Sequence, residues 1–99
     1  MDRKKIEKIV SNTLKQDPDR DYIESISLFG SFVRGEATKT SDIDLFFEMR
    51  KTPSLFRILA IQQRLEKKLG RRVDLVSRGS LDTHVKERVL AEAVKIYDR

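Results

Sequence analysis

The alternation of apolar and polar positions divides the first third of the chain into a helix, a turn and a strand. Residues 2–15 repeat apolar side chains at three- and four-residue intervals, the spacing of an amphipathic helix. QDPDRD follows, and its Pro18 and flanking acids are typical of a turn. In residues 22–30, YIESISLFG, successive side chains fall into two alternating sets, one for each face of a strand. This pattern predicts a strand that ends at Gly30.

The middle of the chain predicts a short helix and an interior strand. SFVRGEA, which follows Gly30, leaves room for only a turn or two of helix before Gly35. Residues 42–49 are apolar on both faces at their centre, so we expect this strand to lie in the interior of a sheet.

The longest helix is predicted over residues 51–70. Thr52 is a candidate N-cap, Pro53 fits the first turn, and Gly70 fits the C-terminal cap. The apolar stripe that we expect to face the core consists of Leu55, Ile58, Leu59, Gln62, Leu65 and Leu69.

The last third predicts a strand over residues 71–77 and a helix over residues 80–92. The apolar side of that helix carries Val85, Val89, Leu90 and Ala93. VKIYD, residues 94–98, is compatible with a short edge strand or with a helix tail, and its periodicity favours neither.

This order of elements predicts one α/β domain over residues 1–99, with a small mixed sheet flanked by helices. No internal repeat and no linker rich in proline, glycine or serine divides the chain. The strands at 42–49 and 72–77 are separated by a long helix, so a crossover connection can join them as a parallel pair.

Composition and charge narrow the classes of function. The chain has no cysteine, which excludes disulfides and thiolate zinc sites, and we expect a cytoplasmic protein. No apolar stretch approaches the roughly 20 residues of a membrane span. The net charge of +5 suits binding to phosphates, nucleic acid or an acidic partner. Alternatively, the lysine and arginine side chains merely keep the exposed helix faces in contact with water. We do not expect nucleic acid, because no basic strand carries interleaved aromatic residues.

Three aspartates stand out against this apolar pattern. Asp42 and Asp44 are two apart, so in a strand their side chains share a face and repel each other unless a cation is present. Asp74 lies inside the apolar strand VDLV, where a charge is costly unless it is paired or binds a metal. We expect the three to converge on a magnesium site, whose ligands are hard oxygens. Alternatively, Asp42 caps a turn and Asp44 pairs with a lysine or arginine.

The Gly30-Ser31 pair supplies a second candidate feature. Gly30 allows a tight turn and a close approach of the backbone to a ligand. The following short helix presents free N–H groups that suit a phosphate, and Ser31 adds a hydroxyl. The alternative is a glycine-ended strand followed by a serine N-cap. GSFVRG lacks the Lys-Ser/Thr end of a P-loop, which excludes that motif.

Taken together, these motifs resemble a known family. Gly30-Ser31, ten intervening residues, Asp42-Ile43-Asp44 and then Asp74 in VDLV resemble the nucleotidyltransferases of the DNA polymerase beta superfamily. The small size resembles the minimal nucleotidyltransferases (MNT), which often act as the antitoxin of an HEPN-type ribonuclease toxin. The resemblance implies a polymerase-beta-like nucleotidyltransferase fold. It also implies transfer of a nucleoside monophosphate, AMP from ATP, to a tyrosine hydroxyl of such a partner toxin.

The resemblance further implies a role for each matching residue. Asp42 and Asp44 would hold two magnesium ions, and Asp74 would share one of them and help to deprotonate the acceptor hydroxyl. Gly30 and Ser31 would hold the β- and γ-phosphates of the nucleotide.

Arg34 would neutralise phosphate charge, or it is a surface cation or a partner of Glu36. A non-catalytic alternative also stays open, in which the protein neutralises its partner by complex formation, as part of a homo- or hetero-oligomer. Phe32, Phe56 and Tyr97 belong either to the core or to such a contact surface.

Overall fold

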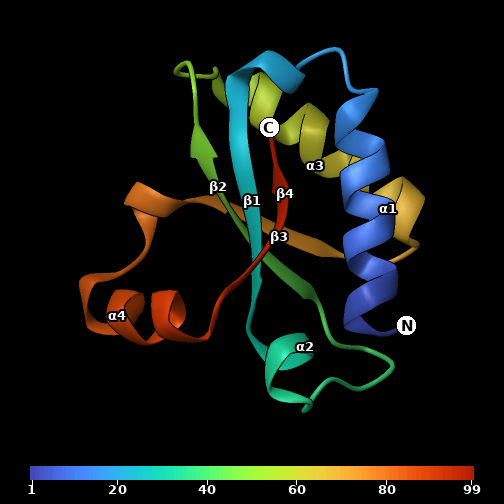
Figure 1. Cartoon of the computed structure of the whole chain (residues 1–99), viewed down its shortest axis with the longest axis vertical. Coiled ribbons are helices and arrows are strands. Elements are labelled where there is room, and N and C mark those ends of the chain that lie inside the picture. Colours follow the sequence, from blue (N-terminus) through green and yellow to red (C-terminus); the bar gives the residue numbers. More distant parts are fainter.

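The computed structural model describes residues 1–99, in which helices and strands follow the predicted order (Figure 1). The elements are α1 (Arg3–Lys15), β1 (Ile23–Phe29), α2 (Ser31–Arg34), β2 (Ile43–Met49), α3 (Leu55–Leu69), β3 (Val73–Ser77), α4 (Thr83–Glu92) and β4 (Val94–Asp98), with 3-10 turns at Arg20–Tyr22 and Arg78–Ser80. VKIYD, for which periodicity favoured neither strand nor helix, is therefore a strand. None of the helices combines the length and apolar character that crossing a bilayer requires.

The four strands form one mixed sheet in the order β3-β2-β1-β4. β2 and β3 are parallel, as the crossover through α3 predicts, and β1 is antiparallel to both β2 and β4. This topology places β1 and β2 in the interior and β3 and β4 at the edges. The predicted interior position of β2 is confirmed, whereas β3 is an edge strand.

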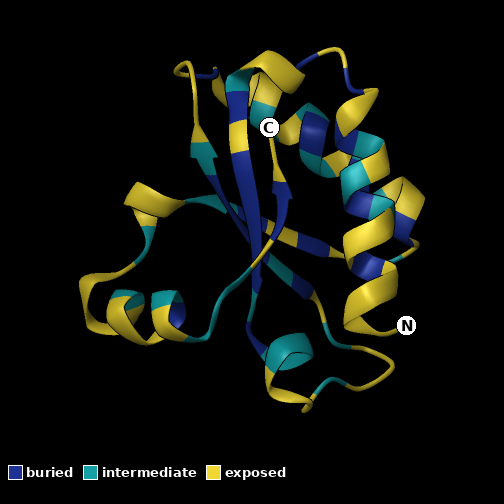
Figure 2. Ribbon diagram, in the orientation of Figure 1, coloured by how far each residue is buried: buried dark blue, intermediate teal, exposed yellow.

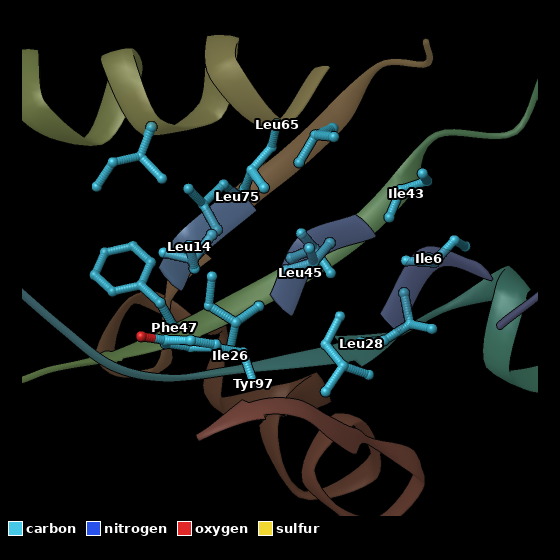
Figure 3. Packing of buried hydrophobic residues seen from close by; sticks show 14 of the residues in the cluster. Ile6, Leu14, Ile26, Leu28, Ile43, Leu45, Phe47, Leu65, Leu75 and Tyr97 are labelled. Atoms are coloured by element: carbon cyan, nitrogen blue, oxygen red, sulfur yellow. The ribbon is translucent and has the colours of Figure 1, made fainter. Parts of the chain in front are cut away.

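The main hydrophobic core lies between the sheet and the pair α1 and α3. α1 contacts α3 and β4, and α3 contacts β3. Because side chains alternate along a strand, Ile43, Leu45 and Phe47 of β2 enter this core, whereas Asp44 and Phe46 face the other way. Figure 3 shows Ile43, Leu45 and Phe47 in this core, together with Leu14 of α1 and Leu65 of α3. The buried strand interiors and the exposed outer surfaces of α1 and α4 are visible in Figure 2.

Both predictions for the start of α3 are wrong. Ser54, not Thr52, is the N-cap, and its hydroxyl accepts a hydrogen bond from the Arg57 N–H at 3.3 Å. Pro53 therefore precedes the cap instead of occupying the first turn. The C-terminal prediction is confirmed, because Gly70 has a φ of +67° and donates its N–H to the Glu66 carbonyl.

The predicted apolar stripe of α3 is only partly correct. Ile61, Leu65 and Leu69 are buried and Ile58 packs beside them, but Leu55 and Leu59 are 69% and 43% exposed. The helix is rotated so that the row through Ile61 faces the sheet. Phe56, one of the aromatic residues left open between core and surface, is 84% exposed, whereas Tyr97 is buried and Phe32 packs against the core.

The predicted apolar side of α4 is also only partly correct. Val89 is its one buried residue, Val85 is exposed, and Ala93 is the C-cap that follows the last helical residue, Glu92. Asp82 caps the helix by accepting the His84 N–H at 2.8 Å.

The turn QDPDRD is more than a connection between α1 and β1. Asp17 and Asp19 are both buried, and Arg64 of α3 donates to a carboxylate oxygen of each, at 2.7 and 3.0 Å. Arg57 donates to Asp19 at 2.6 Å. Burial alone would raise the pKa of Asp19, but the hydrogen bonds and charges of Arg64 and Arg57 outweigh it and hold that pKa below its ordinary value. The turn is thus tied to the middle of α3.

Candidate active site

The predicted aspartates and the Gly-Ser pair meet at one end of the sheet, on the face opposite the main core. β1 ends beside the start of β2, so Phe29 lies opposite Asp44. On the other side of β2, Asp44 is in register with Asp74 of the parallel strand β3. Asp44 therefore occupies the centre of the site, with the end of β1 on one side and Asp74 on the other.

Gly30 and Asp44 are packed closely enough that only glycine fits. Gly30 has a φ of +79°, a conformation that strains any other residue. A Cβ placed on Gly30 would lie 3.0 Å from Asp44 Cγ and would overlap its Oδ2. The tight backbone turn predicted here is confirmed, and the backbone of Gly30 runs directly against the central carboxylate.

Ser31 is the first residue of α2, and the alternative of a serine N-cap is wrong. Gly30 is the N-cap, and its carbonyl accepts the N–H groups of Val33 and Arg34 at 3.1 and 3.2 Å. The Ser31 hydroxyl forms no hydrogen bond within the chain and is partly accessible, so it is available to an external acceptor.

Asp42 and Asp74 differ from Asp44 in their environments. Asp42 precedes β2 and is exposed, with Arg72 at 3.9 Å as its ion-pair partner. Asp74 is exposed as well, which corrects the expectation of a costly buried charge. Its neighbours Val73 and Leu75 enter the core, but the strand alternation points Asp74 to the other face, and β3 lies at the sheet edge.

The pKa of Asp44 is raised above its ordinary value. Partial burial of its carboxylate, which disfavours the charged form, is the largest cause. The negative charges of Asp74 and Asp42 add to the rise. The positive charge of Arg34 opposes the shift, and Glu92 contributes to it. Asp42 and Asp74 therefore repel the charged form of Asp44, and an added cation would relieve this repulsion.

The donor set suits a hard cation, although the side chains are not gathered into a finished cage. No group of three or more acidic, histidine or cysteine side chains is arranged closely enough to hold a metal ion. Oxygen donors from Asp42, Asp44 and Asp74 at one end of the sheet nevertheless match the chemistry of magnesium. Such a site binds through one or two carboxylates and completes its coordination with water and substrate phosphate.

Arg34 is held by two carboxylates at the end of α2. Its Nε donates to Glu36 at 3.2 Å, which confirms the pairing considered from the sequence. Its Nη1 donates to both oxygens of Glu92, at 3.0 and 3.2 Å. Glu92 is the last residue of α4 and was missed, because its partner lies 58 positions away and nothing in the helix pattern marks it.

The loop that carries Asp42 is fixed by a residue just before β3. Arg71 donates from Nη1 to the carbonyl oxygens of Thr38 and Ser41, at 3.0 and 3.1 Å. Its guanidinium also stacks over Phe32 of α2, 5.2 Å from the ring centroid. Arg71, which belongs to the basic segment KKLGRR (residues 67–72), thus anchors the loop that leads to Asp42.

Comparisons with known proteins agree with this geometry. The polymerase beta nucleotidyltransferase family matches residues 4–99. Protein adenylyltransferase MntA of Thermococcus cleftensis is 38% identical over 91 residues, which is 92% of each chain.

Solved structures agree as well. A structure assigned as a minimal nucleotidyltransferase superposes with a TM-score of 0.78 at 33% identity and covers 95% of both chains. A chain of a toxin-antitoxin complex crystallised with AMP-PNP superposes with a TM-score of 0.76 at 26% identity, covering 94% of this chain and 73% of that one. Because the match runs from α1 to the last strand and includes the sheet end where Asp44 meets Gly30, the chain belongs to the polymerase beta nucleotidyltransferases and has their minimal fold.

Proposed function

We propose that the protein transfers AMP from magnesium-bound ATP to a tyrosine hydroxyl of an HEPN-type partner toxin and thereby acts as its antitoxin. The observation that carries this proposal is the position of Asp44, with Gly30 against one side of it and Asp74 in register on the other. Two comparisons support the choice of substrate: the relative from Thermococcus cleftensis is a protein adenylyltransferase, and a structural neighbour is a toxin-antitoxin complex with an ATP analogue.

The carboxylates are the groups that would hold the metal. Magnesium bound by Asp42, Asp44 and Asp74 would stabilise the charge that develops on the phosphate oxygens during in-line displacement. Asp44 must be ionised to act as a ligand, and the same neighbours that raise its pKa also bring a second and third oxygen donor to the site. Asp74, exposed and in register with Asp44, would accept the proton of the incoming hydroxyl.

The Gly30 turn and α2 supply the phosphate side of the site. Gly30 lets the backbone approach a ligand without side-chain interference, and the free Ser31 hydroxyl adds a donor. Arg34 adds a positive charge close enough to oppose the rise in the pKa of Asp44. These groups would bind the β- and γ-phosphates, which leave together as pyrophosphate when the bond to the α-phosphorus breaks.

The tyrosines of this chain do not suit the acceptor role. Tyr97 is buried in the core. Tyr22 precedes β1, at the opposite end of that strand from Gly30, and lies beneath Arg57 and Lys51. The acceptor hydroxyl is therefore assigned to another molecule.

A labelling experiment tests the proposal. The protein is incubated with the product of the neighbouring reading frame, magnesium and ATP labelled at the α-phosphate. We expect label on a tyrosine of the partner, lost with Asp44→Asn and retained with Asp98→Asn, an exposed aspartate at the end of β4. Absence of label with the unmodified protein, across magnesium concentrations and with a folded partner, would rule out the transfer reaction.

A second candidate is neutralisation by complex formation alone. The structural neighbour with AMP-PNP is an assembled toxin-antitoxin pair, so binding by itself can account for antitoxin action. If complex formation alone is sufficient, the double variant Asp42→Ala, Asp44→Ala still protects cells from the toxin. If the double variant still forms the complex but no longer protects cells, the catalytic function is favoured instead.

A further inference from the structure

Arg34 is the cation whose charge acts on Asp44, and its guanidinium is restrained on two sides. Glu36 holds Nε from the loop after α2, and Glu92 holds Nη1 from the end of α4. Nη2 donates to no group of the chain. A guanidinium anchored in this way cannot turn freely, and it keeps a pair of N–H donors for a ligand.

The contact with Glu92 is the better anchored of the two. The Arg34 and Glu92 side chains are 36% and 17% exposed, whereas the Glu36 side chain is 63% exposed. Glu92 binds Nη1 with both carboxylate oxygens, and it ends a helix that leads directly into β4. Glu36 lies in a loop outside any helix or strand. A side chain fixed at the junction of α4 and β4 therefore limits where the guanidinium of Arg34 can lie.

We propose that Glu92 is a positioning residue for nucleotide binding, which holds Arg34 so that Nη2 points to the phosphate of the bound nucleotide. This inference rests on the proposed function, because it assigns Arg34 to a nucleotide phosphate. Ordering a long side chain in advance lowers the entropy cost of binding, so the benefit appears as affinity. Glu92 itself touches neither nucleotide nor acceptor.

Two effects of Glu92 can be separated by substitution. Its negative charge raises the pKa of Asp44 and partly cancels the charge of Arg34. Its oxygens supply the hydrogen bonds that orient the guanidinium. Glu92→Gln removes the charge but keeps one acceptor oxygen, whereas Glu92→Ala removes both.

Binding of magnesium-ATP, measured by calorimetry, tests the positioning role without any acceptor protein. We expect about tenfold weaker binding for Glu92→Ala and for Arg34→Ala, and nearly full affinity for Glu92→Gln, since the loss of one oriented, charge-assisted contact is of that order. Glu87→Ala, an exposed glutamate of the same helix, is the matched control and leaves the affinity unchanged.

The double variant Arg34→Ala, Glu92→Ala decides whether Glu92 acts through Arg34. If it does, the double variant binds no more weakly than Arg34→Ala alone. An affinity loss equal to the product of the two single losses would overturn the inference, as would unchanged affinity in Glu92→Ala. Equal urea midpoints for all variants show that the changes do not arise from unfolding.

Kinetics and nuclear magnetic resonance give readouts that a structural role alone would not produce. In the transfer assay Glu92→Ala raises KM for ATP about tenfold and leaves kcat within about threefold, the pattern of lost uniform binding. Separately, the Nη1–H signals of Arg34, whose acceptor is Glu92, are protected from exchange in the unmodified protein and in Glu92→Gln, and lose that protection in Glu92→Ala.

The spectra also separate this inference from the proposed function. If the unmodified protein binds no magnesium-ATP, the nucleotidyltransferase proposal fails, and the spectra still show whether Glu92 orders Arg34. If ATP binds and the Arg34 signal is equally exchangeable in Glu92→Ala and in the unmodified protein, the positioning role fails by itself.

Discussion

Gly30 and Asp44 restrict each other at the scale of single residues. A side chain on Gly30 meets two separate obstacles, a positive φ and the carboxylate of Asp44. Gly35 has a similar φ of +73°, but no other group lies within 4 Å of the position that a Cβ would take there. The two glycines thus allow backbone strain to be separated from steric overlap.

We predict that Gly35→Ala lowers the free energy of unfolding by about 1 kcal/mol, the usual cost of this backbone conformation. Gly30→Ala, which adds the overlap with Asp44, lowers it by about 2–4 kcal/mol. It also abolishes nucleotide binding, whereas Gly35→Ala retains it. Urea denaturation and calorimetry measure the two effects, and equal stability losses in the two variants would contradict the assigned overlap.

The raised pKa of Asp44 leads to a prediction about stability and pH. An acid whose pKa is higher in the folded state than in the unfolded chain stabilises the fold only while it is protonated. That contribution is complete below the ordinary value of 3.8 and is lost as pH rises through the folded pKa. Without metal, Asp44→Asn therefore unfolds at higher urea than the unmodified protein at pH 7, and the gain disappears in acid. Asp98→Asn serves as the control; an equal gain from it would contradict the prediction.

At the scale of elements, α3 shows how an apolar pattern can misplace a helix face. Leu55, Ile58 and Leu59 share the correct spacing with the true core row, but the ends of α3 are fixed by Ser54 and by the Gly70 turn. The sheet then contacts the row through Ile61 and Leu65, which leaves Leu55, Phe56 and Leu59 exposed. Spacing alone therefore included the exposed Leu55 and Leu59 in the stripe and left out the buried Ile61.

A matched pair of substitutions on α3 tests this orientation. Leu65→Ala removes a fully buried side chain and is expected to lower the free energy of unfolding by about 2–5 kcal/mol. Phe56→Ser removes a larger apolar side chain that is 84% exposed, and we expect a change within about 0.5 kcal/mol. Urea denaturation of both variants provides the measurement, and a large loss in Phe56→Ser would mean that this face of the helix is covered.

At the scale of the whole molecule, the Asp17–Asp19 turn joins α1 to α3. Arg64 donates to both buried carboxylates, so its removal leaves Asp17 without its ion-pair partner and Asp19 with Arg57 alone. We predict that Arg64→Ala costs about 2–4 kcal/mol, more than a surface pair and less than a fully buried one. Arg72→Ala, whose partner lies at 3.9 Å on the surface, is the control and should cost less than about 1 kcal/mol.

The same turn predicts how the protein unfolds in acid. The pKa of Asp19 is lowered in the folded state, so its contribution to stability is present above the unfolded value of 3.8 and is lost as pH falls through the folded pKa. Asp19→Asn should therefore destabilise the protein at neutral pH and flatten the loss of stability below pH 3.8. Acid titration followed by circular dichroism provides the check; an unchanged acid transition would contradict it.

Local sequence determined most of the elements and indicated the candidate site. The apolar periodicity, the Gly30 turn and the two-residue spacing of Asp42 and Asp44 each act within a few residues. The order of helices and strands up to α4 and the candidate site residues were therefore predicted without a structure, whereas β4 was not. The parallel pairing of β2 with β3 also followed, because a long helix between two strands provides the crossover that such a pair requires.

Only the tertiary structure decided which distant groups meet. The exposure of Asp74 depends on β3 lying at the sheet edge, and the buried face of α3 depends on how the helix packs against the sheet. The contact between Arg34 and Glu92 joins residues 58 positions apart. Charges and packing contacts of this kind act through space, so neither periodicity nor spacing along the chain can indicate them.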